Sequence, residues 1–178
     1  MMFMHRVLYP GRFQPFHKGH LRVVERLLRE FDEVVIVIGS AQEGFTCNNP
    51  FTASERIEMI DYVLKNNGIS RDRYWLIPIP DIRMPLAWTT YVLSMVPRVD
   101  AVASGNPHVV KIYDWIGFKT IKLNLFSPSE YNGTIIRRRI CNGMEWKNLV
   151  PEQVARYIES INGVERIREV CGCGDHRD

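Results

Sequence analysis

The sequence contains no apolar run of the roughly 20 residues that a membrane-spanning helix requires. Its N-terminal segment also lacks the apolar stretch and the small-residue cleavage site of a secretory signal peptide. These two absences argue against a membrane partner and against export, so we expect a cytoplasmic protein.

A large excess of charge is missing as well. Lys and Arg number 23 against 20 Asp and Glu, which gives a net charge of +3. The dense basic run Arg137–Arg139 is too short to form a polybasic tail. A positive charge this small suits an anionic substrate and does not favour nucleic acid as a partner.

Cysteine is scarce, and its spacing is not that of a disulfide framework. The four positions are Cys47, Cys141, Cys171 and Cys173. Cys171 and Cys173 together with His176 are one ligand short of a metal site. We therefore expect residues 171–178 to be a C-terminal tail with incidental cysteines, and residues 1–170 to form one domain.

The composition that remains is ordinary for a globular domain, with 46% hydrophobic and 24% charged residues in a chain of 178. Strand-like and helix-like apolar patterns alternate, which predicts an α/β fold with a parallel sheet. We expect strands at 6–9, 33–38, 73–79, 99–103 and 119–123. We expect helices at 18–30, 86–96, 108–116 and 135–142 (capped by Thr134), from Thr52 to a stop at Asn67, and from Pro151 to a stop at Gly163.

Ligands of such folds bind at the carboxyl ends of the strands, so the first strand-to-helix loop is the place to search. It reads Gly11-Arg12-Phe13-Gln14-Pro15-Phe16-His17-Lys18-Gly19-His20. A helix N-terminus offers backbone N–H groups to phosphate, His17 and His20 share one side of the first turn, and Gly19 leaves room for close approach. The loop therefore favours a polyphosphate ligand. The alternative is that one histidine caps the helix and the other lies at the surface.

Residues His17 to His20 form an H-x-G-H motif, and this motif resembles that of the nucleotidylyltransferase superfamily. The longer string G-R-F-Q-P-F-H-K-G-H is more specific and resembles the archaeal-type nicotinamide-mononucleotide adenylyltransferases. Segments that also resemble this family are G-S-A-Q at 39–42, N-P-F-T-A-S-E-R at 49–56, S-G-N-P at 104–107 and Y-N-G-T-I-I-R-R at 131–138. The resemblance extends over nearly the whole chain.

The resemblance implies a Rossmann-like, doubly wound parallel sheet in a single nucleotidylyltransferase domain. It implies an enzyme that transfers the adenylyl group of ATP to nicotinamide mononucleotide (NMN), giving NAD and pyrophosphate in NAD biosynthesis. Mg²⁺ would accompany ATP, without a dedicated protein metal site, and the protein would be a homo-oligomer.

The resemblance also implies roles for single residues. His17 and His20 would hold the ATP phosphates and stabilise the transferring group, while Arg12 and Arg137 would bind the leaving pyrophosphate. The whole ATP site would comprise Gly11, Arg12, His17, Gly19, His20, Gly105, Asn106, Thr134 and Arg137. Ser40 would meet the acceptor's phosphate, and Trp88 would stack on the nicotinamide ring.

Some features leave alternatives open. Trp88 could instead be a core residue of its helix. Asn48 is neutral where relatives often carry charge, and Pro85 interrupts a stretch that is usually polar. The acceptor could instead be deamido-NMN, flavin mononucleotide or pantetheine phosphate. A non-catalytic nucleotide-binding regulator is an alternative of a different class.

Overall fold

The computed structural model describes residues 4–124, 127 and 129–173. Its centre is a five-stranded sheet in the order β3-β2-β1-β4-β5, and every neighbouring pair of strands is parallel. The strands are β1 (Arg6–Gly11), β2 (Glu33–Ile38), β3 (Tyr74–Pro78), β4 (Ala101–Ser104) and β5 (Thr120–Lys122). The predicted doubly wound parallel sheet is confirmed.

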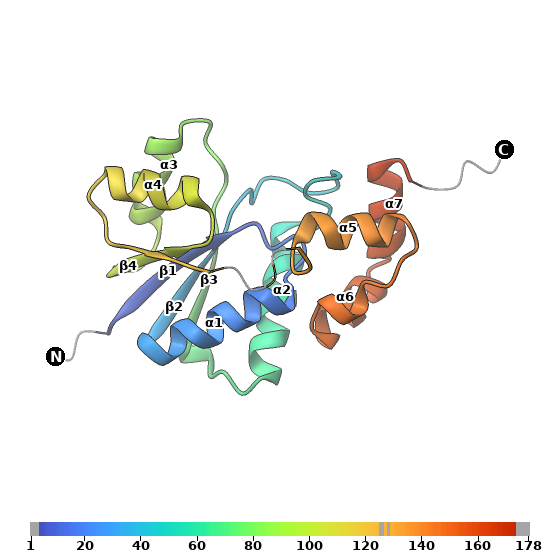
Figure 1. Cartoon of the computed structure of the whole chain (residues 1–178), viewed down its shortest axis with the longest axis horizontal. Helices are drawn as coiled ribbons and strands as arrows, with labels where there is room; N and C mark the ends of the chain where they lie inside the picture. Colours follow the sequence, from blue (N-terminus) through green and yellow to red (C-terminus); the bar gives the residue numbers. More distant parts are fainter. Residues whose placement is uncertain (1–3, 125–126, 128, 174–178) are drawn as a thin grey trace.

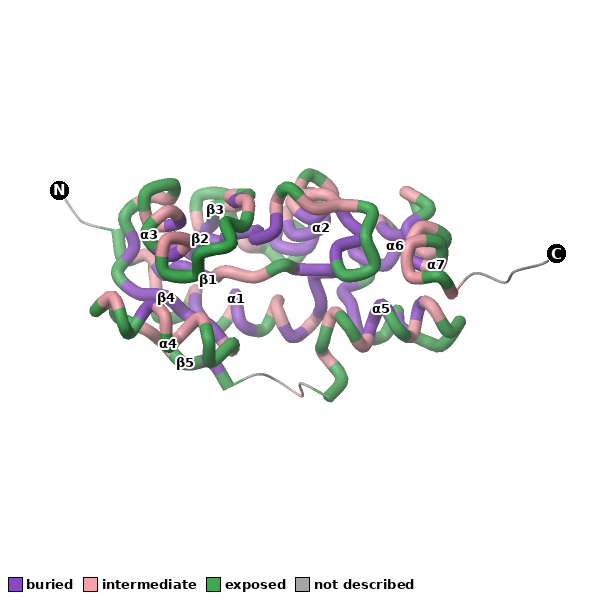
Figure 2. The backbone as a smooth tube through the Cα atoms, turned by 90° about the horizontal axis from the view of Figure 1, so that it is seen from above, coloured by how far each residue is buried: buried purple, intermediate pink, exposed green. Residues whose placement is uncertain are grey.

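The sheet is covered on both faces, because alternate side chains of a strand point to opposite sides. Val7 and Tyr9 of β1 belong to one buried cluster, whereas Leu8 belongs to the other. Helices α1 (Lys18–Glu30) and α2 (Ala53–Asn66) pack on the first face, and α3 (Pro85–Met95) and α4 (Pro107–Trp115) on the second (Figure 1). Figure 2 shows the buried residues running through the middle of the molecule, along the strands and the inner faces of the helices.

The strand order reverses direction between β1 and β4. The chain moves from β1 outward to β2 and β3, and then returns to the other side of β1 for β4 and β5. At such a switch point the loops that follow the two central strands turn away from each other and leave a crevice. The H-x-G-H loop after β1 and the S-G-N-P turn after β4 border this crevice.

Three helices gather beyond one end of the sheet (Figure 1). They are α5 (Gly133–Cys141), α6 (Glu152–Ser160) and α7 (Gly163–Cys171). Short 3-10 turns occupy Arg71–Arg73 and Lys147–Leu149. The predicted cap of α5 was wrong by two residues, because Asn132 is the cap and its side chain accepts a hydrogen bond from the backbone N–H of Thr134 at 2.8 Å.

The predicted stop at Gly163 is also wrong, because Gly163 begins α7. Asn162 adopts a left-handed conformation with φ of 53°, which turns the chain sharply between α6 and α7. A side chain at Gly163 would place its Cβ 2.9 Å from the carbonyl oxygen of Ile158. The glycine is therefore needed for the close approach of two helices, and it does not terminate one.

The expectation of incidental cysteines is overturned. Cys47 forms a disulfide with Cys171, and Cys141 forms one with Cys173. The expected tail begins one residue inside α7, while His176 lies outside the described residues. The boundary at residue 170 stays a prediction. Across the part of the chain that the structure describes, no helix has the length and apolar character needed to cross a membrane.

Candidate active site

A pocket of about 330 Å³ lies at the switch point, between the loop after β1, the turn after β4 and the start of α5. All nine residues predicted to bind ATP line it. They are Gly11, Arg12, His17, Gly19, His20, Gly105, Asn106, Thr134 and Arg137. Residues separated by more than 120 positions in the sequence therefore form one concave surface, as an ATP site requires.

The two residues predicted to bind the acceptor do not line this pocket. Ser40 follows β2 and is only 5% exposed, and its hydroxyl donates to the carboxylate of Asp81 at 2.5 Å. Trp88 lies in α3, partly buried against the second core cluster, and its indole N–H has no hydrogen-bond partner among the described residues. Both residues belong to the β2 and β3 side of the switch point, so their acceptor role stays a prediction.

His17 and His20 cap the first helix reciprocally. The backbone N–H of His20 donates to Nδ1 of His17 at 3.3 Å, and the backbone N–H of His17 donates to Nδ1 of His20 at 3.2 Å. The two rings stack with their centroids 3.5 Å apart. Helix capping and a place in the pocket wall are therefore combined in the same two side chains, and they are not alternatives.

This capping fixes the tautomer of both rings. A nitrogen that accepts a backbone N–H cannot carry its own proton, so each neutral imidazole must be protonated at Nε2. Each Nε2–H is thus free to donate to an anionic oxygen in the pocket. The H-x-G-H spacing supplies two neutral donors of fixed orientation at the N-terminus of a helix, where the helix dipole also favours negative charge.

Burial keeps both imidazoles neutral. It lowers the pKa of His17 to about 4. Burial, with a contribution from the adjacent His17, also lowers the pKa of His20 well below its ordinary value. A phosphate ligand would therefore meet neutral N–H donors at neutral pH.

The lowered pKa of His17 predicts a loss of stability in mild acid. The unfolded chain takes up the proton near pH 6.5, whereas the folded chain resists it down to about pH 4. Lowering the pH from 7 to 5 should therefore cost about 2 kcal/mol of unfolding free energy, from about 1.5 pH units at 1.36 kcal/mol each. Urea unfolding at both pH values, in the wild type and in His17→Asn, checks this. A pH dependence that is the same in both proteins would contradict it.

Gly19 is required by the packing of the motif. A Cβ at this position would lie 2.9 Å from Cβ of Tyr131 and 3.1 Å from the ring of His17. A side chain would therefore push Tyr131 or the His17 ring away from the pocket. The glycine of the motif makes room for the protein's own side chains as well as for a ligand.

Arg137 reaches the pocket from α5 with its guanidinium held on three sides. Nη1 donates to the carbonyl of Gln14 at 2.7 Å, Nε to the carbonyl of Cys47 at 3.0 Å, and Nη2 to the hydroxyl of Thr134 at 3.3 Å. A guanidinium has five N–H groups, so two remain for a ligand. The side chain is preorganised, and binding phosphate would cost it little further entropy.

Arg56 is a residue that sequence reasoning missed. It is fully buried, and it donates four hydrogen bonds, all to backbone carbonyls, at 2.7–3.1 Å. The four carbonyls belong to Arg12, Gly39, Ser40 and Thr52. One side chain thus joins the H-x-G-H loop to the end of β2 and to the start of α2.

A cluster of positive charge results around the pocket. Burial, and then the neighbouring charge of Arg12, lower the pKa of Arg137 to about 10. Burial also lowers the pKa of Arg56 to about 10, with Arg12 acting in the same direction and Asp81 against it. Arg56 and Arg137 stay charged at neutral pH. A polyphosphate would relieve the repulsion between these guanidinium groups and that of Arg12.

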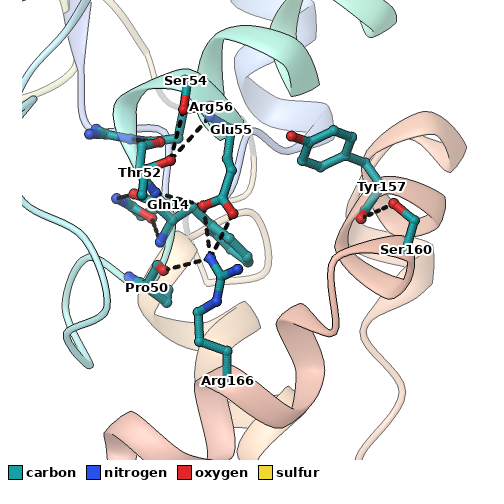
Figure 3. A network of polar contacts seen from close by, with 10 residues as sticks. Gln14, Pro50, Thr52, Ser54, Glu55, Arg56, Tyr157, Ser160 and Arg166 are labelled. Atoms are coloured by element: carbon teal, nitrogen blue, oxygen red, sulfur yellow. Dashed lines mark hydrogen bonds and ion pairs between the residues drawn. The ribbon is translucent and has the colours of Figure 1, made fainter.

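Gln14 and Asp81 are further residues that the sequence did not single out. The Gln14 amide donates to the carbonyl of Phe51 at 2.8 Å and accepts from its N–H at 3.0 Å, which joins the first loop to residues 39–51 (Figure 3). Asp81 lies in the strand-to-helix loop after β3, and its two carboxylate oxygens accept hydrogen bonds from the backbone N–H and the hydroxyl of Ser40. Gln14 is buried and Asp81 is exposed, and only the fold shows which distant segments each of them joins.

The pocket lining offers few side chains that could bind a metal ion, so a metal ion there would be held mainly by the phosphates of ATP. The lining residues include histidines and arginines but no carboxylate. The described residues also contain no group of three or more His, Cys, Asp or Glu side chains that could hold a metal ion.

Known proteins are similar to this chain in sequence. Residues 8–139 match the cytidylyltransferase-like family. The chain belongs to this family. The cytidylyltransferase-like chain is 46% identical to the nicotinamide-nucleotide adenylyltransferase of Saccharolobus solfataricus, over 95% of this chain and 98% of that protein. It is also 46% identical to the protein of the same name from Pyrococcus furiosus, over 93% of this chain and 88% of that protein. The predicted resemblance to archaeal-type enzymes is confirmed.

A solved structure agrees with the cytidylyltransferase-like fold. The chain superimposes with a TM-score of 0.79 on a bifunctional NMN adenylyltransferase/ADP ribose pyrophosphatase from Francisella tularensis, complexed with AMP and a Mn ion. The alignment covers 96% of this chain and 52% of that protein, so the chain spans about half of its length. At 21% identity the likeness concerns the fold alone.

Proposed function

We propose that this chain transfers the adenylyl group of ATP to NMN and releases pyrophosphate, and so forms NAD. The observation that carries the proposal is the convergence of nine predicted nucleotide-binding residues on one pocket. The relatives named nicotinamide-nucleotide adenylyltransferase, 42–46% identical, support the same reaction.

The reaction is a direct displacement at phosphorus. A phosphate oxygen of NMN forms a bond to the α-phosphorus of ATP while the bond from that phosphorus to the bridging oxygen of pyrophosphate breaks. The Nε2–H groups of His17 and His20 stabilise the charge on the transferring group, and Arg12 and Arg137 hold the leaving pyrophosphate. No side chain needs to form a covalent intermediate, so positioning and charge stabilisation account for catalysis.

Magnesium would enter with ATP, coordinated by phosphate oxygens, as it commonly is in sites with few protein ligands. When bound it neutralises charge on the departing pyrophosphate. The arginine cluster of the pocket supplies the same kind of stabilisation from the protein side.

The acceptor would occupy the other half of the crevice, after β2 and β3. Ser40, oriented by Asp81, would face the NMN phosphate, and Trp88 would lie beside the nicotinamide ring. ATP on the β1 and β4 side and NMN on the β2 and β3 side would approach from opposite directions, which an in-line displacement requires.

Arg12 provides a clean test of the phosphate site, because its side chain is exposed and makes no structural hydrogen bond among the described residues. Arg12→Ala should lower kcat/KM for ATP about 100-fold, which corresponds to about 2.7 kcal/mol, and leave the melting temperature unchanged. Arg138→Ala, on the exposed side of α5, is the matched control and should keep full activity. Equal activities of the two variants would contradict the assignment of Arg12.

The proposed function itself is tested with ATP, Mg²⁺ and a panel of acceptors. NMN, deamido-NMN, flavin mononucleotide and pantetheine phosphate are compared by pyrophosphate release and by the adenylylated product, with His20→Ala as control. NAD formation that the control lacks is the expected result. Use of flavin mononucleotide or pantetheine phosphate would keep the mechanism and overturn the role of Trp88. Binding of ATP without turnover of any acceptor would favour the regulator.

We further propose that the protein is a cytoplasmic homo-oligomer with no nucleic-acid or membrane partner. The mild net charge of +3 supports the absence of a nucleic-acid partner. Light scattering of the purified protein measures the oligomeric state, and a monomeric mass would contradict the proposed homo-oligomer.

A further inference from the structure

The C-terminal helix α7 is fastened to the loop of residues 39–51, beside the pocket. Arg166 of α7 donates to both carboxylate oxygens of Glu55 at 2.8 Å and to the carbonyl of Pro50 at 3.3 Å (Figure 3). Its guanidinium also lies 4.3 Å from the ring centre of Phe45. The Arg166 and Glu55 side chains are 14% and 15% exposed, so this attachment is largely shielded from water.

Two disulfides extend the attachment to the end of α7. Cys171 is bonded to Cys47, which lies in the exposed tip of the loop, and Cys173 is bonded to Cys141, the last residue of α5. All four cysteines of the sequence are thus paired, and the C-x-C motif joins two separate elements to one helix end. Within the tip, the N–H of Thr46 donates to the carbonyl of Asn49 at 3.2 Å, and the N–H of Asn49 donates to the hydroxyl of Thr46 at 3.1 Å. The disulfide adds a covalent bond from this tip to α7.

The loop tip also contributes to the phosphate site. The carbonyl of Cys47 accepts the Nε–H of Arg137 at 3.0 Å. The other two acceptors of this guanidinium, Gln14 and Thr134, belong to elements that line the pocket. Of the three hydrogen bonds that orient the Arg137 guanidinium, the one to Cys47 is therefore the one that depends on the position of an exposed loop.

We propose that Cys47, held by its disulfide to Cys171, is a positioning residue that aims Arg137 at the phosphates of ATP. The Cys141–Cys173 disulfide differs, because neither of its residues bonds to the Arg137 guanidinium among the described contacts. It joins α5 to α7 and leaves the three acceptors of Arg137 in place. The phosphate role of Arg137 rests on the proposed function.

The two disulfides can be removed separately. The double variant Cys47→Ser/Cys171→Ser keeps the second bond, and Cys141→Ser/Cys173→Ser keeps the first, so no unpaired thiol remains in either. Each should lower the melting temperature by about 10 °C. At a temperature where both variants are folded, Cys47→Ser/Cys171→Ser should raise KM for ATP about tenfold, because the loss of one hydrogen bond to a charged group has an effect of about this size. Cys141→Ser/Cys173→Ser should leave KM for ATP unchanged, and neither double variant should alter KM for NMN.

Equal KM values for ATP in both double variants would overturn the positioning role. Thiol titration of the unfolded, unreduced wild type should find no free thiol, and four free thiols, with or without bound zinc, would also overturn it. Calorimetric titration with ATP alone separates this proposal from the proposed function. If the wild type forms no NAD, the proposed function is refuted. If ATP affinity is nevertheless lower in Cys47→Ser/Cys171→Ser than in the wild type, and unchanged in Cys141→Ser/Cys173→Ser, the positioning role is retained.

Discussion

The variant His17→Asn should lower kcat/KM about 10²–10³-fold with little change in stability, because it removes one hydrogen-bond donor to the transferring phosphate. Asparagine keeps an oxygen where Nδ1 accepts the backbone N–H of His20, and asparagine is a good helix N-cap. It lacks the Nε2–H that the capped imidazole presents to the pocket. Steady-state kinetics and thermal unfolding of the same preparation measure both quantities.

The comparison with His17→Ala separates chemistry from capping. Alanine loses the donor and also the cap, so it should be about as inactive as asparagine but less stable by about 1 kcal/mol. If His17→Asn retains wild-type kcat/KM, the imidazole acts only as a cap, and the interpretation of the motif as a phosphate site is wrong.

Replacing Arg56 should have the largest effect on stability. Arg56→Met removes all four of its hydrogen bonds while keeping a side chain of similar length. It leaves the buried carbonyls of Arg12 and Gly39 without this donor, whereas those of Ser40 and Thr52 keep a backbone N–H donor. Breaking a buried charged network of this kind costs about 3–5 kcal/mol. Urea unfolding followed by circular dichroism measures the loss.

Arg29→Met is the matched control, because Arg29 lies exposed in the last turn of α1. A surface substitution of this kind should change the unfolding free energy by less than about 0.5 kcal/mol. A loss below about 1 kcal/mol for Arg56→Met would show that the three joined segments hold together without it.

Local patterns were enough to predict most of the fold. The helix at 18–30 and the strand at 33–38 agree with α1 and β2 to the residue, because an amphipathic stripe and a β-branched run are strong signals. The predicted helix start at Thr52 is confirmed, since Thr52 caps α2 in a reciprocal capping box with Glu55. The short α7 was missed because its start, Asn162-Gly163, reads as a helix stop when the packing against Ile158 is not known.

The ATP half of the site could be predicted, since its residues lie in continuous motifs at the ends of strands. Arg56 could not be assigned in the same way, because only the fold shows that it is buried and which carbonyls it binds. The disulfides were equally hidden, with Cys47 and Cys171 separated by 124 residues. Trp88 depended on resemblance alone, and the structure leaves it in partial contact with the core.

The central claim is that the α-phosphate of ATP moves directly to an acceptor phosphate. Parallel reactions with NMN, Mg²⁺ and ATP labelled at the α- or the γ-phosphate test it, with the products separated and the enzyme precipitated. The account predicts α-label in NAD, γ-label in pyrophosphate and no label on the protein. Label from the γ-phosphate in a phosphorylated acceptor, or α-label bound covalently to the enzyme, would contradict it.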